Sequence, residues 1–190
     1  MLFTLTKDKI MELGDLKKLI DEAATDCQEI INENPVIVLS EGDFERLLST
    51  CIEDRLSQNN IDEYGVHTQI SHYFDGYAHP DRRVDILLLK ENEIYPHVNH
   101  KEFIYNKDSF AIEVKYLHKK DSVLRVMDDY SKRGEIESNS WLYVITLLDS
   151  DNEKTYKKRK ERIEAMRELM IEHDKEYDKN LFCKVLKKDI

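Results

Sequence analysis

Apolar residues recur at spacings of three and four over residues 8–32, and this period predicts an amphipathic helix. Asn34-Pro35 ends the pattern, because the residue before a proline is pushed out of the helical region. Residues 35–39 form a short apolar run, which is compatible with either a strand or a buried connector. The apolar stripe of the helix consists of Leu13, Leu16, Ile20, Ala23, Cys27 and Ile30.

A second helix is predicted to begin after Ser40. Serine is a favoured N-cap, and Asp43, three residues later, can complete a capping box. The polar residues 58–60 end the helical pattern. Its apolar positions are Phe44, Leu47, Leu48, Cys51, Ile52 and Leu56.

The pattern then changes to one typical of strands. Residues 66–74, 83–89 and 110–117 are rich in branched and aromatic side chains, and we predict three strands that form a meander, with one long insertion before the third. Asp75-Gly76 and residues 79–81 are expected to mark the first turn. The insertion, residues 90–108, is interpreted equally well as an extended hairpin or as a loop that binds substrate or a partner.

Helices and strands alternate over the last third of the chain. Asp121 or Ser122 can cap a short helix that carries Val123, Val126, Met127 and Tyr130. Residues 141–148 are almost continuously apolar, as in a strand buried on both faces. A long charged helix over residues 152–178 and a last strand over residues 181–186 complete an α/β fold, in which helices flank a mixed sheet.

The length of 190 residues is that of one compact domain. We divide it into a helical extension, residues 1–34, which packs on the core or on a partner, and a main domain, residues 35–190. The first and last helices both carry heptad-like apolar seams. We expect these two helices to pack on each other, with a homodimer or larger complex as the alternative.

Composition restricts the location and the partners of the protein. No apolar run approaches the eighteen residues that cross a bilayer, and the first residues lack the features of a signal peptide, so we expect a cytoplasmic protein without a membrane partner. The three cysteines are scattered and are interpreted as buried free thiols. A net charge of −10 argues against general attraction to a polyanion, so any contact with nucleic acid requires a local basic patch.

Charged residues interrupt two of the predicted apolar strands. Glu113 and Lys115 are two residues apart, so both side chains lie on one face of their strand. Asp85 interrupts the preceding strand in the same way. A buried carboxylate needs a partner, which a metal ion or Lys115 would supply. The alternative is a surface salt bridge in which Lys115 pairs with Glu113 or Asp85 across the strands.

Asp85 followed by Glu113-Val114-Lys115, with a helix and a buried strand behind them, resembles the PD-(D/E)XK nuclease superfamily, which has the restriction-endonuclease-like fold. The resemblance covers residues 40–148. It implies a Mg²⁺- or Mn²⁺-dependent nuclease that hydrolyses phosphodiester bonds, most simply a DNA endonuclease, with RNA as the other substrate. The pair Pro80-Asp81 is assigned to the turn, and Asp85 is the better match to the acid of the family.

The resemblance also implies a role for each site residue. Asp85, Glu113 and an acid from the second helix would hold the metal, joined by the backbone carbonyl of Val114. Glu45 is the best match for the helix acid, and Glu41 is the alternative. Asp85, Glu113 and Lys115 form the catalytic set, in which Lys115 positions the nucleophilic water.

The short helix after the Glu-x-Lys strand departs from the family pattern, because many relatives carry a glutamine there. Asp129 or Lys132 could reach the site, although we expect both to face solvent. A basic patch near this helix could contact nucleic-acid phosphates, or be an ordinary solvated surface. Its candidate contact residues are Lys119, Lys120, Lys132 and Arg133.

Two further functions remain compatible with the sequence. One is a non-catalytic module on the same fold that binds nucleic acid or a protein. The other is a nuclease subunit whose partner supplies recognition and most of the affinity for DNA. The acidic net charge favours the first, because a free-standing nuclease usually carries more positive charge.

Overall fold

The computed structural model of the protein describes residues 13–74, 77–90, 94–96, 103–105, 110–132, 141–173 and 180–189. Its main sheet has the strand order β1-β2-β5-β6-β7. β2 is antiparallel to both β1 and β5, whereas β5, β6 and β7 run parallel, so the sheet is mixed, as predicted. The strands are β1 (Tyr64–Phe74), β2 (Tyr77–Lys90), β5 (Phe110–Leu117), β6 (Trp141–Ser150) and β7 (Leu181–Asp189).

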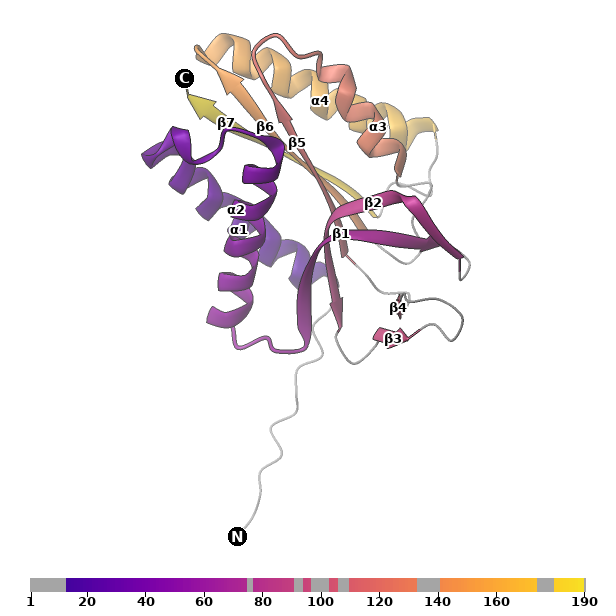
Figure 1. Ribbon diagram of the computed structural model, residues 1–190. Coiled ribbons are helices and arrows are strands. Elements are labelled where there is room, and N and C mark those ends of the chain that lie inside the picture. The colour runs from indigo at the N-terminus through magenta and orange to yellow at the C-terminus, as the bar shows by residue number, and fades with distance from the viewer. Residues whose placement is uncertain are drawn as a thin grey trace.

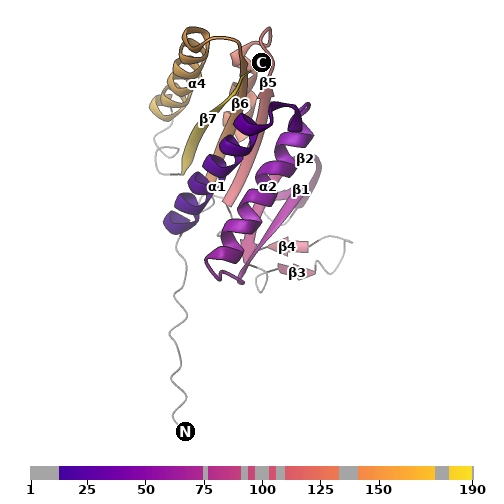
Figure 2. The same cartoon turned by 90° about the vertical axis from the view of Figure 1, so that its left-hand side faces the viewer.

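Helices cover both faces of this sheet, which confirms the predicted α/β class (Figure 1). Figure 2 looks onto the face covered by α1 (Leu13–Glu33) and α2 (Glu41–Gln58). The short η3 (Val123–Arg125) and α3 (Val126–Ser131) cover the opposite face together with α4 (Glu153–His173). None of the helices that the structure describes is long and apolar enough to cross a membrane.

Strand β6 separates the two hydrophobic cores. Tyr143, Ile145 and Leu147 belong to the core under α1 and α2, whereas the alternate residues Leu142 and Val144 belong to the core under α3 and α4. Both sets are almost fully buried. The apolar run over residues 141–148 therefore reflects burial on both faces, as its composition predicted.

The expectation that the first and last helices pack on each other is wrong, because the sheet lies between them (Figure 1). Leu16 and Ile20 of α1 are buried in the core that includes α2, and Ile163 and Met166 of α4 are buried in the other. A seam at helical spacing shows that a helix has a buried face, and here both seams are buried against the sheet.

A short connection between α1 and α2 precedes the N-cap of α2. Residues 35–37 form a 3₁₀ turn, so the run is not a strand. Val36 and Leu39 are 70% and 69% exposed, whereas Val38 is fully buried, so the connector is buried at one position rather than throughout. The capping interaction of Ser40 is confirmed: its Oγ accepts a hydrogen bond of 3.1 Å from the backbone N–H of Asp43. Asp43 Oδ2 accepts the backbone N–H of Leu39 in return.

The β1-β2 hairpin is longer than predicted. Phe74 pairs with Tyr77 and Tyr73 with Ala78, so residues 79–81 lie within β2, and their assignment to the turn is wrong. Asp75 and Gly76 lie outside the described residues. Within the insertion over residues 90–108, β3 (Ile94–Pro96) and β4 (Phe103–Tyr105) pair as antiparallel strands, which agrees with the hairpin interpretation.

Candidate active site

The candidate site lies where β2 and β5 separate. The ladder between these strands ends at the pair Ile86 and Ile112, and the next positions in the same register are Asp85 and Glu113. Beyond the ladder, the backbone N–H of Val114 donates a hydrogen bond of 2.8 Å to Oδ2 of Asp85. The two acids of the predicted site therefore lie at a fork in the sheet, where the backbone ladder between β2 and β5 has ended.

Glu113 is a buried carboxylate with one unsatisfied oxygen. The residue is only 1% exposed. Burial raises the pKa of Glu113 and the nearby charge of Asp85 acts in the same direction, whereas the contact with Lys132 lowers it and favours the ionised form. Lys132 Nζ lies 2.5 Å from Oε2. Within the part of the chain that the structure describes, Oε1 is buried and has no hydrogen-bond partner.

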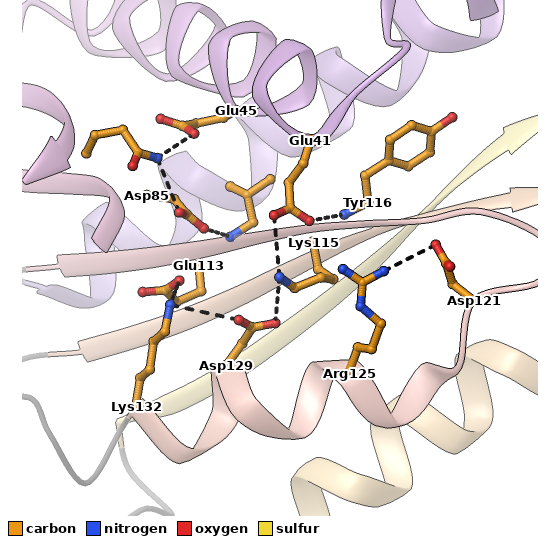
Figure 3. Close-up of polar contacts among 12 residues, drawn as sticks. Glu41, Glu45, Asp85, Glu113, Lys115, Tyr116, Asp121, Arg125, Asp129 and Lys132 are labelled. Atoms are coloured by element: carbon orange, nitrogen blue, oxygen red, sulfur yellow. Dashed lines mark hydrogen bonds and ion pairs between the residues drawn. The ribbon is translucent and has the colours of Figure 1, made fainter. Parts of the chain in front are cut away.

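Lys115 lies between two carboxylates from different helices (Figure 3). Its Nζ is 3.4 Å from Oε1 of Glu41 on α2 and 3.5 Å from Oδ2 of Asp129 on α3. The side chain is 14% exposed, so the alternative of a surface salt bridge to Glu113 or Asp85 is wrong. Two anions from opposite sides hold this ammonium group next to the fork.

The two candidate acids of α2 contact different parts of the site. They are four residues apart and therefore lie on the same face of the helix. Glu41 reaches Lys115, and its Oε2 accepts the backbone N–H of Tyr116 at 3.1 Å. Glu45 lies near Asp85. Burial, the largest cause, and the charge of Asp85 both raise the pKa of Glu45, whereas a hydrogen bond from Gln69 lowers it. Both acids thus belong to the site.

Gln69 of β1 links two of the acids and was not identified from the sequence. Its Nε2 donates to Oε2 of Glu45 at 2.8 Å and lies 3.4 Å from Oδ1 of Asp85. Its φ of 55° places it in the left-handed region, which is unfavourable for a residue with a side chain. A glutamine in a strand gives no sequence signal for this conformation. Strained residues of this kind concentrate at functional sites.

Asp129 and Lys132 point into the site, so the expectation that they face solvent is wrong (Figure 3). Val126 and Tyr130 are fully buried and fix the orientation of α3. Asp129, next to Tyr130 and three residues after Val126, is consequently 4% exposed, and burial raises its pKa to about 6 despite the opposing charges of Lys115 and Lys132. The position of Asp129 beside the apolar stripe was the signal that could have identified it.

The predicted nucleic-acid contacts do not share one environment. Lys119 and Lys120 are exposed in the turn after β5, and Lys119 Nζ pairs with Asp151 at 3.2 Å. Lys132 contacts Glu113 instead of extending into solvent. Arg133 lies outside the described residues.

Carboxylate oxygens are suitable ligands for a hard cation, although in this structure the acids are not close enough together to enclose one. No group of three His, Cys, Asp or Glu residues in the described part of the chain is close enough to hold a metal ion. The amide of Gln69 lies between Glu45 and Asp85, and the ammonium of Lys132 lies on Glu113. However, the buried and unsatisfied Oε1 of Glu113 beside the charge of Asp85 is an oxygen donor of the type that Mg²⁺ and Mn²⁺ prefer.

Comparisons of the chain with known protein families, curated proteins and solved structures gave no match. Carboxylates at a fork in the sheet can bind a divalent cation, and the restrained ammonium of Lys115 can orient a water molecule or neutralise a developing negative charge.

Proposed function

We propose that the protein is a metal-dependent nuclease of the restriction-endonuclease-like, PD-(D/E)XK type, which hydrolyses phosphodiester bonds in DNA. The observation that supports this proposal best is the position of Asp85 and Glu113 at the fork between β2 and β5, with Lys115 on the same strand as Glu113. The order of acid-bearing helix, strands, short helix and buried parallel strand also agrees with this fold.

In the proposed site, Asp85 and Glu113 would hold Mg²⁺ or Mn²⁺, together with Glu45 and the backbone carbonyl of Val114. The bound ion would polarise the phosphate and lower the pKa of a coordinated water. Lys115 orients the attacking water and balances negative charge at the phosphorus. Because Glu41 and Asp129 both contact its Nζ, the lysine is restrained before substrate binds.

The exposed Lys119 and Lys120 are proposed to contact the phosphate backbone beside this site. Two such contacts give only weak affinity, and the net charge of −10 opposes the approach of DNA. Cleavage should therefore be sensitive to salt, because screening weakens the contribution of exposed cations.

The direct test is cleavage of supercoiled, linear and single-stranded DNA and of RNA with Mg²⁺ or Mn²⁺. We expect the parent protein to cut DNA, and Asp85→Ala and Lys115→Ala to abolish cutting. Asp62→Ala and Lys154→Ala, which change exposed residues of the same types, are the matched controls and should cut like the parent. Equal cutting by Lys115→Ala and the parent would exclude the proposed role of this lysine.

A second candidate function is a non-catalytic binding module on the same fold. It is favoured by the ion pairs of Lys132 with Glu113 and of Lys115 with Glu41 and Asp129, which neutralise the acids without a metal. Thermal unfolding with and without Mn²⁺ separates the two functions, since only a metal site gains stability from the ion. Mn²⁺ binding without cleavage of any substrate would instead favour a nuclease subunit that depends on a partner.

A further inference from the structure

Lys132 contacts the acid that the metal would need. Its Nζ lies 2.5 Å from Oε2 of Glu113 and 3.9 Å from Oδ1 of Asp129. Glu113 is 1% exposed, and its other oxygen is buried without a hydrogen-bond partner among the described residues. Glu113 thus has one oxygen neutralised by an internal cation and a second that is ready for another ligand.

The two lysines of the site differ in the element that carries them and in their exposure. Lys115 is on the central strand β5, is 14% exposed and contacts acids from both α2 and α3. Lys132 follows the last residue of α3, and its side chain is 34% exposed. A lysine is a point charge on a flexible stem, so Lys132 can leave Glu113 without disturbing the buried residues that anchor α3.

A buried carboxylate is costly without a positive partner, and a divalent ion supplies twice the charge of an ammonium group. A metal ion on the free Oε1 and the ammonium of Lys132 on Oε2 would repel each other across one carboxylate. We propose that Lys132 is an internal cation that neutralises Glu113 before metal binds, and that the incoming ion displaces it.

This inference rests on the proposed function, because it assumes that Glu113 is a metal ligand. It adds an exchange of cations to metal binding. The displaced ammonium remains tethered beside the site, where it is available to a phosphate group of the substrate. Metal occupancy would then control when this cation becomes accessible.

The first experiment compares Mn²⁺ affinity by calorimetry in the parent protein, Lys132→Met and Lys157→Met, without any substrate. Both variants lose one positive charge, but Lys157 pairs with the exposed Glu153 on α4 rather than with Glu113. We expect Lys132→Met to bind Mn²⁺ about tenfold more tightly than the parent, as for a coupled site. Lys157→Met should change the affinity by less than about twofold, because its charge is exposed and screened.

Each outcome has a separate meaning. Equal or weaker binding by Lys132→Met, with Mn²⁺ binding intact in the parent, overturns the displacement while leaving the proposed nuclease site in place. Absence of Mn²⁺ binding from both proteins overturns the metal site, and the displacement with it. Glu113→Gln provides the check that heat of binding comes from this site, because it should remove most of it.

A second measurement uses the parent protein, so that it does not depend on the folding of a variant. Amine acylation followed by mass spectrometry reports how reactive each lysine is. We expect saturating Mn²⁺ to increase the acylation rate of Lys132 several-fold, and to leave that of the exposed Lys157 unchanged as an internal control. An unchanged rate at Lys132, under conditions in which calorimetry detects bound Mn²⁺, would show that the ammonium is not displaced.

Discussion

The hydroxyl of Tyr116 donates a hydrogen bond of 2.6 Å to Oδ1 of Asp149, and both residues are buried. Lys188 Nζ donates to the same hydroxyl at 2.7 Å, and His118 Nδ1 lies 2.9 Å from Oδ2 of Asp149. This network joins the ends of β5, β6 and β7. Since Tyr116 directly follows Lys115, the network also fixes the end of the strand that carries the candidate catalytic lysine.

Tyr116→Phe should therefore destabilise the protein more than an ordinary loss of one hydroxyl. The substitution leaves Asp149 and Lys188 buried with one partner fewer each, which costs about 1–3 kcal/mol. Urea denaturation of the parent and the variant measures this difference. Tyr156→Phe is the matched control, because its hydroxyl makes one part-buried hydrogen bond to the carbonyl of Val185. Equal losses in the two variants would contradict a special role for the network.

Helix α1 is expected to be essential to the fold rather than a removable extension. Ile20 is fully buried in the core that α1 shares with α2 and the sheet. Ile20→Ala should lower the free energy of unfolding by about 2–5 kcal/mol, the usual cost of such a truncation in a core. Lys18→Ala, on the exposed side of the same helix, should change it by less than about 0.5 kcal/mol. A loss below about 1 kcal/mol for Ile20→Ala would mean that α1 contributes little to the core.

The secondary structure could be predicted because it depends on local patterns. Period three to four identified α1 and α2, the Ser40 cap identified where α2 begins, and the apolar run identified β6. The packing of α1 relative to α4 could not be predicted in this way. A periodic seam shows that a face is buried but does not show against which element, and strand order decided this.

The residues of the candidate site also differ in whether a local sequence pattern reveals them. Asp85, Glu113 and Lys115 could be identified because charges within apolar strands are conspicuous. Gln69 was not identified, and Lys132 was expected to face solvent, because the position of Gln69 depends on a backbone dihedral angle and that of Lys132 on the direction of a short helix. The sequence also could not decide between Glu41 and Glu45, because each has a different partner in the folded protein. Glu45 accepts a hydrogen bond from Gln69, and Glu41 accepts one from the backbone N–H of Tyr116.

Gln69 offers a test of whether backbone strain is stored at the site. A left-handed conformation costs a residue with a side chain about 1–2 kcal/mol, and glycine avoids this cost. Gln69→Gly and Gln69→Ala both remove the amide that links Glu45 to Asp85, so they differ mainly in the backbone. We expect Gln69→Gly to be more stable than Gln69→Ala by about 1 kcal/mol in urea denaturation. If the alanine variant were the more stable, Gln69 would not be strained in solution.

Asp129 should make stability depend on pH in an unusual direction. Its pKa is raised from 3.8 to about 6, with burial as the largest cause, so between these values the folded protein retains a proton that the unfolded chain loses. The stabilising contribution is complete below the unfolded pKa and is lost as pH rises through 6. A difference of about two pKa units corresponds to roughly 3 kcal/mol.

Asp129→Asn removes this titration, so unfolding measured from pH 4 to pH 7 should show a smaller loss of stability with rising pH than in the parent. Asp128→Asn, one position earlier on α3 and exposed, controls for the change in net charge and should follow the parent curve. Because both variants are compared with the parent over the same range, titration of the groups that do not interact with Asp129 cancels. Parallel curves for Asp129→Asn and the parent would show that Asp129 is ionised in the folded protein throughout, as a carboxylate paired fully with Lys115 would be.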